Sequence, residues 1–277
     1  MALLAQLQAQ RQAVIRCQRR LVQAAAARAG SAVGYHTGLP AAERKALCAA
    51  RAAIVKAIET DAPAPAGYER QTAAVRVFVS ACLASRRPFD AMRRDTEAAM
   101  VAAAKRLPVW PWAQTVRGFG PLGLACIVGE CGHLLLLPEG RSSVGKLWSR
   151  FGLAPAQHYA VTTKAGKVAI AKPKARRAVM WTIGDSLLKT NQDGYRSLYL
   201  DRLRHEYDAA TAAGLRVVAS GKAVVESWRK RGLPLPTVGK SKAGETRTVK
   251  HLTNRAQRYT EKRLLRDLWA AWRGSAG

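Results

Sequence analysis

Acidic residues are scarce in this sequence of 277 residues, in which 18 Asp and Glu stand against 46 Lys and Arg and leave a formal net charge of +28. Such an excess repels itself unless a polyanion binds, so nucleic acid is the first choice of partner and an anionic membrane surface the second. The carboxylates form no tight pair, and no G-x-S-x-G, H-E-x-x-H or phosphate-loop lysine motif occurs. Catalytic residues therefore stay unknown. We expect no cofactor, with Mg²⁺ needed only if the protein actively cleaves nucleic acid.

Long apolar runs are also missing. No stretch approaches the roughly 18 apolar residues that span a membrane, and the N-terminus lacks a signal-peptide pattern. The cysteines are too widely spaced for a zinc knuckle, and the histidines do not cluster near them; they are Cys17, Cys48, Cys82, Cys126 and Cys131. We therefore expect no metal site, reduced cysteines and a cytoplasmic protein without a membrane partner.

The composition favours helices. The hydrophobic fraction of 48% argues against disorder, and alanine supplies much of it. We predict a mainly α fold with helices over about 2–29, 41–60, 69–84, 89–106, 121–130, 142–151, 175–190, 193–213, 218–231 and 251–273. A small β-hairpin or ordered loop is expected in 156–172 and an exposed loop over 232–249. The predicted domains are a helical arm or hairpin (1–106), a helix-hairpin-helix nucleic-acid-binding domain (107–190) and a basic helical C-terminal region (191–277).

The most informative motif is a glycine turn within residues 116–125. Gly118 and Gly120 are separated by one residue, and Pro121 then opens an apolar helical run that contains Gly123. Glycines allow close backbone approach, and the free N–H groups of a helix N-terminus attract anions. A dinucleotide fold is rejected because the preceding Trp-Pro-Trp segment is a poor parallel strand. The turn predicts a helix-hairpin-helix contact to a nucleic-acid phosphate.

A second feature is the absence of acid from Gly140 to Gly184. A solvated surface normally mixes both signs of charge, so this window favours phosphate contact. We predict a nucleic-acid site that combines the three glycines of the turn with basic residues of the window: Lys146, Arg150, Lys164, Lys167, Lys172, Lys174, Arg176 and Arg177.

A third feature is a basic set near the C-terminus, among which lie Tyr259 and two tryptophans. The set includes Lys250, Arg255, Arg258, Lys262, Arg263 and Arg266. Two interpretations stay open: a solvated outer face of a packed helix, or a binding face added to that packing.

Three segments occur in an order that resembles a known family. They are Val116–Glu130, Lys146–Pro155, and Lys172–Arg177 opening a helix. The order is similar to the C-terminal part of bacterial insertion-sequence transposases that join a DEDD nuclease-like domain to a serine domain and work with a guide RNA. The resemblance covers about residues 90–190. It implies a mainly helical nucleic-acid-binding domain, with Gly118 and Gly120 in the hairpin and Arg176 and Arg177 at the basic helix start.

The chain also departs from that family. Its first hundred residues lack the strands and carboxylates of the nuclease domain, and Val161–Gly166 contains no serine where the serine step belongs. The family's catalytic residues therefore do not carry over. Our leading hypothesis is a protein that binds DNA or structured RNA, is associated with a mobile element and is not catalytic on its own. The alternatives are an active transposase or recombinase and an RNA-structural protein. A homodimer or a larger mobile-element complex is left open.

Overall fold

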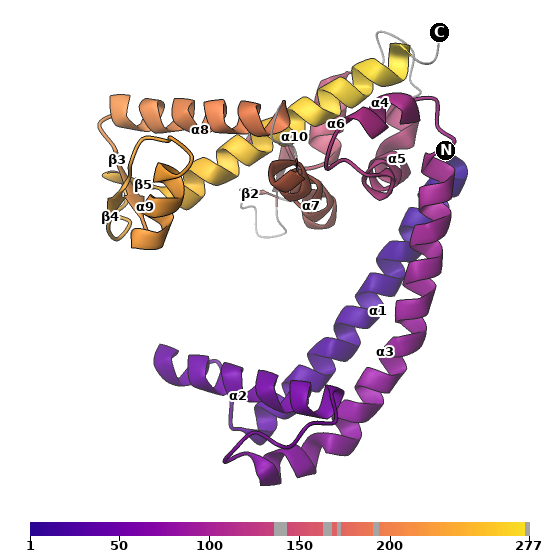
Figure 1. The fold of residues 1–277 in the computed structure, drawn as a ribbon, viewed down its shortest axis with the longest axis vertical. Coiled ribbons are helices and arrows are strands. Elements are labelled where there is room, and N and C mark those ends of the chain that lie inside the picture. The colour runs from indigo at the N-terminus through magenta and orange to yellow at the C-terminus, as the bar shows by residue number, and fades with distance from the viewer. Residues whose placement is uncertain (136–142, 163–167, 171–172, 191–193, 275–277) are drawn as a thin grey trace. The chain divides into compact units, whose positions relative to one another are not determined.

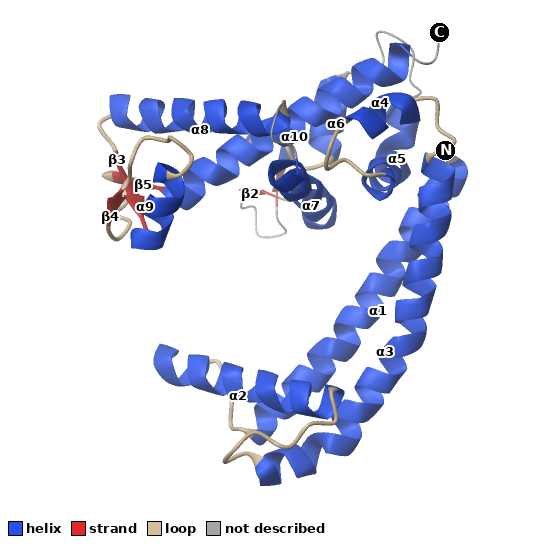
Figure 2. Cartoon of the chain, in the orientation of Figure 1, coloured by secondary structure: helices blue, strands red, loops and turns tan. Residues whose placement is uncertain are grey.

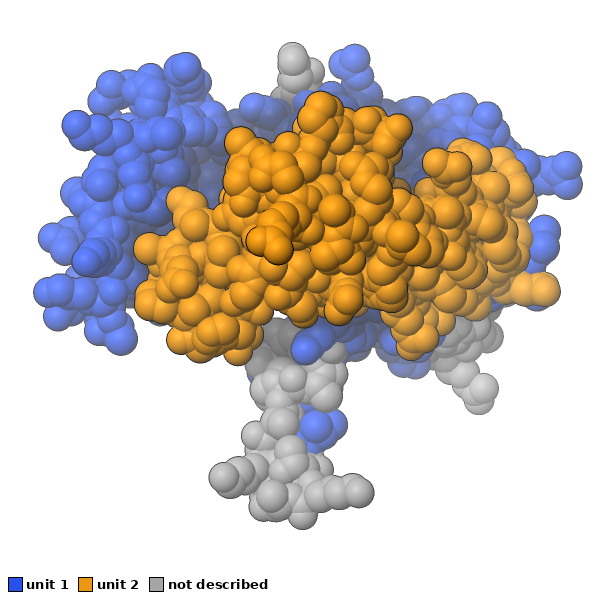
Figure 3. Space-filling model, turned by 90° about the horizontal axis from the view of Figure 1, so that it is seen from below, with its two compact units in different colours: residues 1–5, 101–277 blue, residues 6–100 orange. Residues whose placement is uncertain are grey.

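The computed structural model describes residues 1–135, 143–162, 168–170, 173–190 and 194–274 (Figure 1). Its contacts divide the chain into two compact units, which Figure 3 shows in separate colours. One unit is Gln6–Met100, and the other joins Met1–Ala5 to Val101–Gly277. The domain boundaries that we placed at residues 106 and 190 stay predictions.

The unit Gln6–Met100 is a helical hairpin with a shorter third helix. Helices α1 (Ala2–Ala32) and α3 (Glu69–Ala104) run antiparallel, as the pairs Arg11–Glu97 at 2.7 Å and Gln18–Asp90 at 2.5 Å require. Helix α2 (Ala41–Glu59) adds Ile54 and Ile58 to a core with small residues of α1 and valines of α3. Alanines at the contact allow close helix approach, which explains the alanine-rich composition of this region.

Helix α3 corrects one of the expectations. We predicted two helices separated at Pro88, but α3 continues through that residue. Proline removes only one backbone hydrogen bond, and Pro88 is exposed, so water can hydrate the carbonyl group that loses its partner. An ion pair between Arg86 and Asp90 at 3.3 Å spans the same turn.

The unit that contains Val101–Gly277 includes the glycine turn and, after it, a small hairpin. Short helix α4 (Trp110–Thr115) leads through the turn into α5 (Pro121–Leu135), which is longer than predicted because it continues through Gly132. The next elements are α6 (Val144–Arg150), the 3-10 helix η1 (Ala156–Tyr159), the antiparallel strands β1 (Ala160–Thr162) and β2 (Val168–Ile170), and α7 (Lys174–Thr190). The mainly helical fold and the small hairpin are confirmed (Figure 2).

The last part of the chain contains a small parallel sheet that the sequence analysis missed. Helix α8 (Tyr195–Ala212) is followed by β3 (Arg216–Ala219), α9 (Lys222–Arg229), β4 (Thr237–Val238), β5 (Thr246–Thr248) and α10 (Val249–Gly274). The strand order is β4-β3-β5, and both pairings are parallel. The helix expected over 218–231 and the exposed loop expected over 232–249 were therefore wrong in part, since both contain strands.

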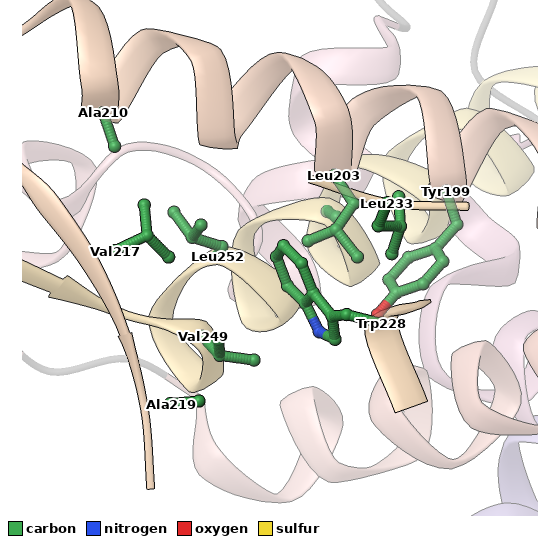
Figure 4. Close-up of a cluster of buried hydrophobic side chains, with 10 residues drawn as sticks. Tyr199, Leu203, Ala210, Val217, Ala219, Trp228, Leu233, Val249 and Leu252 are labelled. Carbon is green, nitrogen blue, oxygen red and sulfur yellow. The ribbon is translucent and has the colours of Figure 1, made fainter. Parts of the chain in front are cut away.

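A compact core fixes this sheet to α8 and α10. Trp228 of α9 is 1% exposed and lies among Leu203, Val217, Leu233 and Leu252 (Figure 4). Helix α10 continues from this core along α8 and packs against α7 and α6 as well. It is the element that α6, α7 and α8 have in common, and it positions the side chains considered next.

Candidate nucleic-acid interface

Gly118 has a structural reason to be glycine. Its φ is +83°, and a Cβ added there would lie 2.0 Å from Thr190 Oγ1 and 2.8 Å from the Ser186 carbonyl oxygen. Phe119, which follows, is 2% exposed and contacts the edge of Trp112 with ring centroids 6.2 Å apart. The missing side chain of Gly118 thus allows the turn to pack on the last turn of α7.

The other two glycines of the turn differ in their surroundings. A Cβ at Gly123 would touch the Phe119 ring at 3.3 Å, whereas one at Gly120 would meet nothing within 4 Å. Gly120 is exposed, and its carbonyl oxygen accepts a hydrogen bond from the Leu124 amide at 3.2 Å. A phosphate contact at this turn would therefore be at Gly120, and that role stays a prediction.

The structure brings Arg150 and Arg176 together at Glu130. Arg176 Nε lies 2.8 Å from the Glu130 carboxylate, and Arg150 Nε donates to the Glu130 carbonyl oxygen at 3.0 Å. These contacts tie α5, α6 and α7 together. An open cleft of about 730 Å³ beside α6 is lined by Arg150, Lys146 and His158. Lys146 and Lys174 are exposed, and Lys164, Lys167 and Lys172 lie outside the described residues.

Arg177 pairs with Glu261 of α10, whose side chain is fully buried. Burial raises the pKa of Glu261 to about 7, although the Arg177 guanidinium opposes that shift. Gly184 makes this close contact between α7 and α10 possible, because a Cβ there would lie 2.9 Å from Glu261 Oε1. Arg177 therefore has a structural partner 84 residues away that its own neighbourhood in the sequence did not reveal.

The predicted nucleic-acid site, which combines the glycine turn with basic residues, is consequently divided into two parts. Gly118 contacts Leu187 near the end of α7, whereas Arg176 lies in the first turn of the same helix. Eleven residues at about 1.5 Å per residue separate the two positions by about 16 Å along the helix. The turn and these arginines would thus contact different phosphates, and the combined nucleic-acid site stays a prediction.

A more concentrated basic surface lies along α10. His251, Arg255, Arg258 and Lys262 follow one another at spacings of four, three and four residues, which places them on one side of the helix. Other residues of α10, such as Leu252, Ala256 and Leu265, are buried. Arg202 of α8 and Arg177 of α7 adjoin this row, and we call the six residues the basic face: Arg177, Arg202, His251, Arg255, Arg258 and Lys262.

One buried carboxylate serves two cations of the basic face. Glu206 is 5% exposed and lies 2.7 Å from Arg255 Nε and 2.9 Å from Arg202 Nε. Both guanidinium groups are held in place by the same carboxylate, because two ion pairs share it. Arg258 and Lys262 have no carboxylate in the ion pairs found among the described residues.

The cations of the basic face repel one another. Burial and then the nearby Arg258 and Arg202 lower the pKa of Lys262. Burial followed by Arg177 and Arg255 lowers the pKa of Arg258, while His251 has its pKa lowered by burial and by Arg247, Arg255 and Arg258. A polyanion would relieve this repulsion, since each phosphate supplies the missing counter-charge.

Aromatic rings are interleaved with these cations. Arg202 Cζ lies 5.0 Å from the centroid of Tyr259, and Lys262 Nζ lies 5.0 Å from that of Trp148. Trp181 of α7 is 49% exposed, and its carbonyl oxygen accepts a hydrogen bond from Gln257 Nε2 of α10 at 3.1 Å. The surface thus offers both positive charge and exposed ring area.

Sequence reasoning found part of this surface. It named Arg255, Arg258, Lys262 and Tyr259 within the C-terminal basic set but assigned the nucleic-acid site to residues 118–177. The helical spacing from 251 to 262 was the available signal. Arg202 and Trp181 carried no local signal, because only the packing of α7 and α8 on α10 brings them beside the row.

Three further findings concern metal, thiol and membrane features of the described part of the chain. No group of three His, Cys, Asp or Glu side chains there is arranged to hold a metal ion. Burial raises the pKa of Cys131 to about 12, so its thiol is no nucleophile near neutral pH. Within the described ranges, no helix combines the length and apolar character needed to cross a bilayer.

Comparisons were made with protein-family models, curated proteins and solved structures. None of the three gives a match to this chain.

Proposed function

We propose that the protein binds nucleic acid, DNA or structured RNA, through the basic face on α7, α8 and α10. The observation that supports this most strongly is the row of basic residues on α10, with Arg177 and Arg202 beside it. Among the described residues, Glu206 and Glu261 are the only carboxylates that form ion pairs with the basic face. Charge of one sign in such density is costly in a free protein and favourable along a sugar-phosphate backbone.

The proposal includes an association with a mobile element. It is supported by the resemblance of residues 90–190 to the C-terminal part of insertion-sequence transposases. The elements that carry that resemblance, α5, α6 and α7, pack beside or against α10. The basic face would then extend the contact surface of that region and not replace it.

Salt dependence tests the proposal quantitatively. If the four arginines and the lysine of the basic face neutralise about five phosphates, log affinity for duplex DNA falls with log salt at a slope of about −4.5, because each phosphate contact contributes about −0.9. Fluorescence anisotropy of a labelled duplex at several salt concentrations measures this slope.

A matched pair of variants locates the contact. The variant Arg255→Gln, Arg258→Gln, Lys262→Gln removes three charges from the basic face and should reduce the slope by about 3. The control Lys45→Gln, Lys56→Gln, Arg94→Gln removes three exposed charges from the other unit and should leave the slope nearly unchanged. Equal effects of the two variants, or a wild-type slope near zero, would refute the assignment.

A further inference from the structure

Trp181 is the exposed aromatic residue whose surroundings point to a particular form of ligand. It lies on α7 with 49% of its surface exposed, although a tryptophan ring ordinarily lies against other apolar groups. Its helix is held to α10 on both sides of it, by Arg177 with Glu261 one turn earlier and by Gly184 against Glu261 one turn later. The ring is therefore presented from a fixed backbone.

The faces of other rings near α10 are already covered. Arg202 lies over Tyr259, Lys262 over Trp148 and Arg273 over Trp269, with cation-to-centroid distances of 5.0, 5.0 and 4.4 Å. Among the described residues, no cation and no second ring covers Trp181 in the same way. Trp181 thus differs from these three rings in having no covering cation within the described part of the chain.

Cations flank the Trp181 ring. Arg177 precedes Trp181 by one helical turn, a spacing that brings side chains within about 5 to 6 Å at Cβ. Arg258 is close enough to Arg177 to lower its own pKa through repulsion, and Gln257 beside it bonds the Trp181 carbonyl oxygen. A phosphate bound by these arginines would place the attached base beside the indole.

From this juxtaposition we infer that the basic face binds unpaired nucleotides, with one base stacked on Trp181. The inference rests on the proposed function and adds the form of the ligand. Duplex bases have both faces covered by their neighbours, so only a single-stranded or looped-out base can offer a face to the indole. The shared chemistry applies to DNA and RNA alike.

The test compares ligands that differ in their bases, their sugar or their strand form. The probes are an oligothymidine strand of about 15 nucleotides, within the range of site sizes known for single strands, an oligouridine strand, an abasic strand and a duplex of equal phosphate number. Trp181→Ala should weaken binding of the two base-bearing strands by about five- to hundred-fold, which is the affinity that one stacked base contributes. Binding of the abasic strand and the duplex should not change. A loss with only one of the two base-bearing strands would identify DNA or RNA as the ligand.

Three further variants make the result specific. Trp181→Phe should retain most of the affinity because it keeps a flat ring, whereas Trp181→Leu should behave like Trp181→Ala although it keeps apolar volume. Phe78→Ala removes a ring of similar exposure, 47%, from the other unit and should have no effect. Equal losses on the abasic strand, or no loss with Trp181→Ala, would overturn the stacking inference. The glutamine variants of the basic face report on the proposed function separately.

Discussion

Replacement of Gly118 by alanine tests whether the glycine turn is held by α7. The new methyl group would lie 2.0 Å from Thr190 Oγ1, which can rotate away only by giving up its 2.7 Å hydrogen bond to the Ser186 carbonyl oxygen. That oxygen, itself 2.8 Å from the methyl position, is backbone and cannot rotate. Left-handed backbone costs about 1 to 2 kcal/mol in a residue with a Cβ, overpacking about 1 to 3, and the lost hydrogen bond about 1. We expect Gly118→Ala to lower the free energy of unfolding by about 3 to 6 kcal/mol.

Urea denaturation followed by far-ultraviolet circular dichroism measures this loss. Gly120→Ala is the matched control, because a Cβ there meets nothing within 4 Å, and it should change stability by less than about 0.5 kcal/mol. Adding Thr190→Ala to Gly118→Ala should recover only part of the loss, since the contact with the Ser186 carbonyl remains. Equal stability of the two glycine variants would show that the turn does not pack on α7, and the reasoning would fail.

Three other predictions concern the packing of α10 and the C-terminal core. Gly184→Ala should lower the free energy of unfolding by about 1 to 3 kcal/mol, because its Cβ would meet Glu261 Oε1 at 2.9 Å. Replacing glycine by alanine inside a helix ordinarily stabilises it. Thermal unfolding shows whether Gly184→Ala stabilises or destabilises, and Ala178→Gly on the same helix is the control that shows the ordinary preference for alanine. Burial raises the pKa of Glu261 to about 7 in the folded protein, from 4.5 for an exposed glutamate, so the unfolded chain loses this proton at lower pH and stability falls as pH rises from about 5 to 7. Glu261→Gln should flatten this slope by up to about 1.4 kcal/mol per pH unit, and an unchanged slope would contradict the prediction. Trp228→Ala should cost about 3 to 5 kcal/mol, because the ring is 1% exposed within the core, and a urea midpoint like that of the wild type would exclude this burial.

Helices were predictable here where apolar spacing was regular over several turns. The start of α7 and the extent of α10 follow from such patterns, and both are close to the observed bounds. Pro88 misled because its usual effect depends on whether water can reach the freed carbonyl group, which only the folded position decides. Strands β4 and β5 are two and three residues long, too short to show an alternating pattern among glycines and lysines.

The site was less predictable than the fold, for a related reason. Local spacing showed that Arg177 belongs to a basic helix start, but its buried partner Glu261 lies on an element far along the chain. Trp181 resembles any other apolar residue of an amphipathic helix until the packing of α7 on α10 shows that it faces outward. Long-range contacts thus decide which cations are structural and which remain available to a ligand.

The position of α10 in the chain has a consequence for biosynthesis. The ribosome makes α6, α7, α8 and the strand β3 before α10, yet all of them pack against it, and α8 and β3 share a hydrophobic core with it. Until α10 leaves the exit tunnel, apolar residues such as Leu203 stay exposed to water. This part of the protein must therefore fold after translation of residues 249–274, and a message cut short before them would yield an aggregation-prone product.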